Sequence, residues 1–222
     1  MTRIFFRNTP LAVLLAGLCL SACTSGSPQR RAVVMLLDTS GTYTEELDKA
    51  RAIINYLLGT LQSGEAMAVA RIDSASFTEK DIVARATFSD KPSTSNAQKR
   101  AFKQTIEKFV KSTNSSTHTD ITGGILQATE FLKESGANHR YIVIFSDLAE
   151  DLVTGQVRDF PLPLEGVEII AVNVTKLRSD NVDPRDYMQR VSTWETRVTR
   201  DGGRWRVVND LERLDNIMQH DR

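Results

Sequence analysis

Residues 31–42 read RAVVMLLDTSGT, and this stretch decides the fold. Its first part, from Ala32 to Leu37, is continuously apolar, which is typical of a strand buried on both faces of a parallel sheet. Its second part places Asp38, Ser40 and Thr42 at alternating positions directly after the strand, with a glycine that lets the chain turn. In open α/β sheets, ligands bind beyond the carboxyl ends of the strands. The stretch therefore predicts a buried strand that ends in an oxygen-rich ligand site.

Further apolar strands and amphipathic helices alternate along the rest of the chain. The predicted strands are 65–72, 82–88, 141–145, 167–174 and 204–208, and the predicted helices are 44–61, about 97–111, 121–132, 184–198 and 211–218. The connection between 65–72 and 82–88 contains no convincing helix, so this pair is predicted to be an antiparallel hairpin. Asp183 before Pro184 favours the start of a helix. Trp205, in the predicted strand 204–208, is expected to be a core residue. The pattern predicts an α/β fold: a doubly wound, mostly parallel sheet with one antiparallel edge strand and helices on both faces.

Composition excludes several classes of protein. The 222 residues are 41% hydrophobic and 25% charged, as in ordinary globular domains. Lys plus Arg and Asp plus Glu both number 28, and a nucleic-acid-binding protein usually shows a basic excess. Cys19 and Cys23 are the two cysteines of the chain, which excludes a disulfide scaffold or a cysteine-rich zinc site.

The N-terminus has the layout of a secretory signal, with a basic start, a short apolar run and small residues. Residues 20–23 read LSAC and resemble the bacterial lipobox, in which signal cleavage leaves a lipidated cysteine at the new N-terminus. We therefore expect 1–22 to be a lipoprotein signal peptide, 23–30 a lipidated N-terminus and tether, and 31–222 one domain. Removal of 1–22 leaves 26 basic and 28 acidic residues, a net charge of −2.

Lipidation of Cys23 predicts an anchor in the membrane of a bacterial cell envelope. Thr24 follows this cysteine, whereas Asp at that position often signals retention in an inner membrane. The resemblance therefore favours the outer membrane where a cell has two membranes.

Three short motifs carry a more specific resemblance. The run Asp38-x-Ser40-x-Thr42 resembles the first motif, Asp-x-Ser-x-Ser, of the metal-ion-dependent adhesion site in von Willebrand factor A domains. Residues 119–124, TDITGG, resemble the second element, a Thr in a loop just before a helix. Asp147 follows an apolar strand, as the third element does. The three motifs occur in the expected order. The resemblance, which includes the order of strands, hairpin and helices, covers nearly all of the predicted mature chain.

The resemblance implies a metal site and a role in protein binding. It implies direct metal contacts from Ser40, Thr42 and Thr119, with Asp38 and Asp147 often acting through water. Such hard oxygen ligands suit Mg²⁺, with Mn²⁺ or Ca²⁺ as other candidates. A carboxylate of a partner protein commonly fills the sixth position in the family. The expected function is therefore metal-dependent binding in adhesion or assembly, with no enzymatic activity.

The sequence departs from the family pattern at two positions. Thr42 replaces the last Ser of the first motif and keeps the hydroxyl. Leu148 stands where the family often has Gly, which could reshape the rim of the site. We expect His118, Asp120 and Leu148 to be candidates for contact with a partner.

Other interpretations remain open at this point. Thr119 or Asp120 could simply cap the following helix. The domain could be a scaffold of an envelope assembly that needs no metal. A haloacid-dehalogenase-like phosphatase has an Asp-x-Asp-x-Thr motif, which Asp38 to Thr42 superficially resembles. Ser40 occupies the second position of that motif, however, and Ser cannot act as the required acid and base.

Overall fold

The structure is a computed structural model that describes residues 29–41, 46–74, 78–113, 115–172, 184–209 and 211–220. Cys23, Thr42 and Asp183, which the sequence singles out, lie outside these residues, as do the signal peptide and most of the tether. The elements in chain order are β1 (Arg31–Asp38), α1 (Leu47–Thr60), β2 (Ala66–Ile72), the 3₁₀ helix η2 (Glu79–Asp81), β3 (Ile82–Thr87), α2 (Pro92–Ser112), α3 (Ile121–Glu134), β4 (His139–Phe145), β5 (Val167–Val172), α4 (Pro184–Arg200), β6 (Arg204–Val208) and α5 (Leu211–His220).

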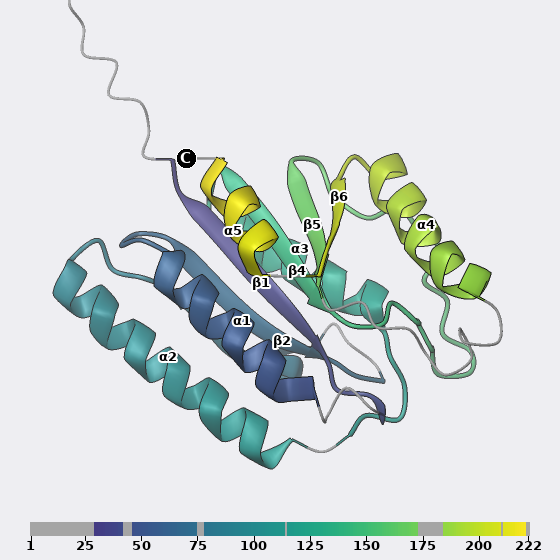
Figure 1. Ribbon diagram of the computed structural model, residues 1–222, viewed down its shortest axis with the longest axis horizontal. Helices are drawn as coiled ribbons and strands as arrows, with labels where there is room; N and C mark the ends of the chain where they lie inside the picture. Colours follow the sequence, from purple (N-terminus) through teal and green to yellow (C-terminus); the bar gives the residue numbers. More distant parts are fainter. Residues whose placement is uncertain are drawn as a thin grey trace, which may run out of the picture.

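The strands form one sheet in the order β3-β2-β1-β4-β5-β6 (Figure 1). Neighbouring strands are parallel except for β2 and β3, which are antiparallel. The predicted fold class and the antiparallel edge strand are therefore confirmed. The strand order reverses at β1, which has β2 on one side and β4 on the other, and this switch point is where ligands bind in such sheets.

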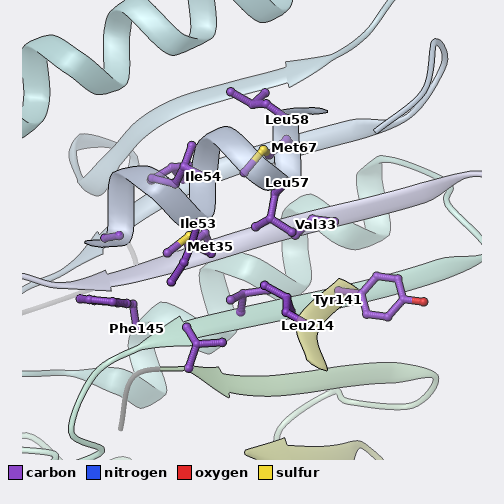
Figure 2. Close-up of a cluster of buried hydrophobic side chains, with 14 of the residues drawn as sticks. Val33, Met35, Ile53, Ile54, Leu57, Leu58, Met67, Tyr141, Phe145 and Leu214 are labelled. Carbon is purple, nitrogen blue, oxygen red and sulfur yellow. The ribbon is translucent and has the colours of Figure 1, made fainter. Parts of the chain in front are cut away.

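Helices cover both faces of the sheet, which explains why β1 is apolar from Ala32 to Leu37. Val33, Met35 and Leu37 face a core formed with α1, α2 and α5, and Figure 2 shows part of this cluster. The alternate residues of β1 face a second core formed with α3 and α4. Because successive side chains of a strand point to opposite faces, a strand between two helical layers must be apolar at every position.

Two sequence predictions need correction. Helix α2 begins at Pro92 rather than near Ala97; its first turn is polar, so no apolar periodicity marks it, although Pro is well suited to that position. Trp205, predicted to be a core residue, is only half-buried and packs against the second core from the edge strand β6. Among the described helices, none is both long and apolar enough to cross a bilayer.

Candidate functional site

The candidate site begins where β1 and β4 end side by side. The pairing of Leu37 with Phe145 places the next residue of each strand, Asp38 and Ser146, next to one another. Oδ1 of Asp38 accepts hydrogen bonds from the amide (2.8 Å) and the hydroxyl (2.6 Å) of Ser40. Oδ2 accepts a hydrogen bond from the Ser146 hydroxyl at 2.7 Å. The first motif thus forms a tight turn around a fully buried carboxylate.

The electrostatic surroundings of Asp38 are unusual for a buried carboxylate. Burial raises its pKa above the ordinary value, and the hydrogen bonds from Ser40 and Ser146 oppose that shift only in part. Within the described part of the chain, its hydrogen-bond partners are neutral, and no Lys, Arg or His side chain pairs with it. Buried charges are ordinarily paired or bound to a metal, and among the described residues no counter-charge faces Asp38.

The loop between α2 and α3 brings the second motif to the same edge. The amide of Ser116 donates to the carbonyl of Thr39 (2.9 Å), which connects the loop to the end of β1. Thr119 exchanges two backbone hydrogen bonds with Asp151, at 2.8 and 2.9 Å, which connects the loop to the segment after β4. Thr119 is largely buried. The three motifs therefore share one edge of the sheet, held there by backbone hydrogen bonds.

The end of β2 supports this loop through Asp73. Its Oδ1 accepts hydrogen bonds from the Ser116 hydroxyl (2.7 Å) and the Ser74 amide (2.6 Å), and its carbonyl accepts one from the Asp120 amide (3.1 Å). Burial opposes the charged form most strongly as a single effect, but the hydrogen bonds from Ser116 and Ser74 and the charge of Arg71 together lower the pKa of Asp73. The negative charge of Asp73 is therefore stabilised by its own partners.

Asp120 caps helix α3, as the alternative interpretation of the second motif allowed. Its Oδ1 accepts a hydrogen bond from the Gly123 amide at 2.8 Å. Its carboxylate also receives the Arg158 guanidinium, with Nη2 2.6 Å from Oδ2, and this hydrogen bond raises the pKa of Arg158. Oε1 of Glu150 accepts a hydrogen bond from another amide of the first turn of α3, that of Thr122, at 2.7 Å. The N-terminus of α3 is thus already occupied by two carboxylates.

The third motif lies just beyond Ser146. Asp147 is largely buried, and its Oδ1 accepts a hydrogen bond from the Ala149 amide at 2.8 Å. Leu148 has a φ of 66°, a left-handed conformation that favours glycine. The side chain of Leu148 is nevertheless only 2% exposed and packs in the second core, and its carbonyl accepts from Trp194 Nε1 at 3.1 Å. Leu148 thus adds core contacts at a position whose backbone conformation favours glycine.

Burial revises the expected partner contacts. Asp120 is fully buried and Leu148 nearly so, so neither offers surface to an incoming protein. His118 is the exposed member of the three, and its Nδ1 lies 2.9 Å from Oδ2 of the exposed Asp151. These two side chains form the accessible rim beside Thr119.

The residues at this edge fit a hard divalent cation. The Ser40 hydroxyl donates its hydrogen bond to Oδ1 of Asp38, so the lone pairs of the Ser40 oxygen can face a cation. Asp38 supplies buried negative charge that no side chain in the described part of the chain neutralises. The described residues hold no cluster of three or more His, Cys, Asp or Glu side chains that could bind a metal. A metal here would therefore depend on oxygen ligands, which suit Mg²⁺, Mn²⁺ or Ca²⁺ and not Zn²⁺ or Cu²⁺.

Some residues that build the site were not predicted as site residues. Ser146 shares Asp38 with Ser40, and its position directly after an apolar strand was the available signal. Arg158 neutralises Asp120 from 38 residues away along the chain, and Glu150 caps α3 from the segment after β4. No sequence pattern marks these two contacts, because they depend on how the 147–159 segment packs.

Comparisons with known proteins give matches by structure. No protein-family profile matches the sequence, and no curated protein matches it significantly. A von Willebrand factor type A structure from Catenulispora acidiphila matches with a TM-score of 0.47 and 11% identity, over 86% of this chain and 41% of the other. The pilus adhesin SpaC from Lactobacillus rhamnosus GG, in an open conformation, matches with a TM-score of 0.50 and 10% identity, over 88% and 30%.

An aerotolerance-related membrane protein from Bacteroides fragilis NCTC 9343, with multiple mutations to serines, matches with a TM-score of 0.47 and 11% identity, over 86% of this chain and 97% of the other. The chain thus spans nearly all of this protein, but less than half of the Catenulispora protein and of the adhesin. Identities of 10–11% show likeness of fold and not of activity.

Proposed function

We propose that this chain, which has the fold of a von Willebrand factor A domain, is a metal-dependent protein-binding module held by a lipid at the bacterial cell envelope. The proposal combines the site at the end of β1 with the predicted lipidation of Cys23. It makes the domain a binding module for adhesion or assembly and not an enzyme.

The observation that carries the metal part of the proposal is the unneutralised carboxylate of Asp38. It is fully buried, and its partners in the described part of the chain are two hydroxyls and an amide. A fold keeps a buried charge at a cost unless something of opposite charge faces it. A divalent cation bound beside the Ser40 oxygen is that counter-charge.

Each residue of the site has a defined task in this proposal. Ser40, Thr42 and Thr119 hold the cation through hydroxyl oxygens, and Asp38 and Asp147 supply negative charge around it. The bound cation supplies an electrophilic centre to which a carboxylate of the partner protein binds. His118 and Asp151 form the exposed rim that such a partner meets first.

Known structures of the same fold support a role in binding. The matched adhesin belongs to a pilus, and the Bacteroides protein is a membrane protein. The lipobox-like residues 20–23 support anchoring of this chain at an envelope, and Thr24 favours the outer membrane.

Binding of Mn²⁺ alone tests the metal site, because the spectrum of free Mn²⁺ in electron paramagnetic resonance decreases as the ion is bound. We expect the wild-type chain to bind Mn²⁺ and to release it to excess Mg²⁺. Ser40→Ala and Thr119→Ala should weaken binding at least tenfold while the circular dichroism stays unchanged. Thr105→Ala is the matched control, since Thr105 lies exposed on α2 and donates to a helix carbonyl. Equal Mn²⁺ binding by all four proteins would refute the proposed site.

A second measurement separates the binding module from the phosphatase and from the metal-free scaffold. If the wild type hydrolysed p-nitrophenyl phosphate and the Asp38→Asn variant did not, the protein would be a phosphatase instead. Envelope proteins captured by the chain should be released by a chelator in the wild type, and Thr119→Ala should not capture them. Capture that a chelator leaves unchanged would favour the scaffold.

A further inference from the structure

Helix α2 carries a row of exposed cations along its outer side. Arg100, Lys103, Lys108 and Lys111 are all exposed. Their spacing of three, five and three residues keeps them on one side of the helix, opposite the buried Phe102 and Ile106. We call these four residues the basic stripe. In Figure 1, α2 lies at the margin of the molecule, next to α1.

The basic stripe contrasts with the charge of the rest of the domain. Between Pro92 and Ser112 there are five cations and one acid, a net charge of +4. The predicted mature chain has a net charge of −2, so the rest of it carries −6. Glu107 is the acid of α2, and it lies 3.9 Å from Lys103. The fifth cation, Lys99, points inward, since it donates to the carbonyl of Leu61 and lies over the ring of Phe88.

Helix α2 begins near the point where the chain enters the domain, about two turns before the stripe. Arg30, just before β1, forms an ion pair of 3.0 Å with Asp90, which is two residues before α2. Cys23 is seven residues before Arg30. Seven residues of chain span at most about 25 Å. A lipid on Cys23 would therefore hold the start of α2 close to the membrane surface.

We propose that the basic stripe of α2 docks on an anionic lipid surface. The inference rests on the envelope anchoring in the proposed function but not on its metal site. A basic patch close to a lipid anchor is a common additional signal for membrane attachment. Lys and Arg within a Debye length of an anionic bilayer are attracted to it. The nearby tether favours lipid over an acidic protein as the occupant, because it delivers this face to the bilayer.

Docking of α2 also affects the candidate metal site. The 21 residues of α2 extend for about 31 Å and lead directly into the loop that carries Thr119. A helix lying along the membrane would place this loop at the end of α2 away from the tether. The partner would then approach the site along the membrane surface.

Vesicle binding by the chain without its lipid tests the stripe directly. We would use residues 23–222 with Cys23→Ser, which keep every described element, and measure partition into vesicles of phosphatidylcholine with or without phosphatidylglycerol. Binding is expected with phosphatidylglycerol only and should fall as salt rises. Each neutralised cation should weaken it about fivefold, so Arg100→Gln, Lys103→Gln, Lys108→Gln and Lys111→Gln together should abolish it.

The control is a variant with four other exposed cations neutralised: Lys80→Gln, Arg85→Gln, Lys133→Gln and Arg185→Gln. It should bind vesicles far better than the stripe variant. Equal loss of vesicle binding in the two variants, or equal binding to both kinds of vesicle, would overturn the proposal. An acidic protein would then be the alternative partner of the basic stripe. Mn²⁺ binding by the stripe variant should equal that of the wild type, so failure here is distinct from failure of the metal site.

Discussion

Replacing Asp38 by Asn should have opposite effects on stability with and without a divalent cation. The carboxylate is fully buried, and its neutral partners are Ser40 and Ser146. Asn keeps the shape and one acceptor oxygen for Ser40 but removes the negative charge. The amide nitrogen would then face Ser146, whose oxygen has a second lone pair available for it.

Two effects decide the result without metal. Hydrogen bonds to charged groups contribute about 1.5–3 kcal/mol and neutral ones about 0.5–1.5 kcal/mol, so Asp38→Asn loses stability through weaker hydrogen bonds. It gains stability because no charge is buried without a partner, a penalty of several kcal/mol. The cost of the buried charge is larger than the contribution of the hydrogen bonds, since the pKa of Asp38 is raised in spite of them. In a chelator, we therefore expect the variant to equal or exceed wild-type stability, by roughly 0–2 kcal/mol.

The cation should reverse this order. At a metal concentration one hundred times the dissociation constant, mass action stabilises the wild type by about 2.7 kcal/mol. For a domain of this size that corresponds to a rise in melting temperature of roughly 5–10 °C. The Asn variant should show little of this increase, because the charge that faces the cation is gone.

Differential scanning calorimetry in EDTA and in Mg²⁺ measures both parts. Asp81→Asn is the control, because Asp81 is also buried but has its own partners, Thr78 and Arg71. This control should lose stability in both buffers and keep the full increase with Mg²⁺. If Asp38→Asn lowers the melting temperature equally in EDTA and in Mg²⁺, Asp38 is a structural residue of the turn and the reasoning fails.

Three further predictions concern the anchor, the rim and the response to acid. Cys23→Ala should release the protein from membranes or leave an unprocessed precursor, as shown by fractionation and mass; a processed variant that stays in the membrane would contradict lipidation. Leu148→Gly relieves a left-handed backbone strain of about 1–2 kcal/mol, but it removes a buried side chain whose truncation costs about 2–5 kcal/mol. Urea unfolding should therefore show a net loss of stability of about 1–3 kcal/mol. A gain in stability would refute the packing argument. The hydrogen bond from Arg200, with that from the Leu162 amide, lowers the pKa of Asp201. Its stabilisation should be present above an ordinary pKa of about 3.9 and disappear as the pH falls through the lowered value; a stability difference between wild type and Asp201→Asn that persists in acid would exclude this.

Much of the fold could be predicted because its signals are local. The apolar run of β1 indicates a strand between two layers, and helical periodicity places α1 and α3 within a few residues of their observed bounds. The missing helix between β2 and β3 predicts the antiparallel pair that the structure has. The start of α2 was placed too late, because a polar first turn has no apolar face to reveal it.

The site was predictable in part. Motif order places Asp38, Thr119 and Asp147 at the carboxyl edge of the sheet, where the structure has them. Whether Thr42 joins them is outside the described residues, and metal binding by the set stays a prediction. Asp120 and Leu148, named as candidates for contact with a partner, are buried, and this burial depends on residues far away in the chain: Arg158 for the first and Trp194 for the second.

The sequence by itself determined the alternation of strands and helices, the hairpin at one edge and the chemistry available after β1, because these depend on neighbours within one or two turns of the chain. Tertiary structure alone decided which charges are neutralised. Asp120 receives Arg158 and Asp73 receives Arg71, whereas Asp38 faces Ser40 and Ser146 within the described part of the chain. That difference depends on which segments the sheet brings together, and Coulomb energy depends on distance in space and not on separation along the chain.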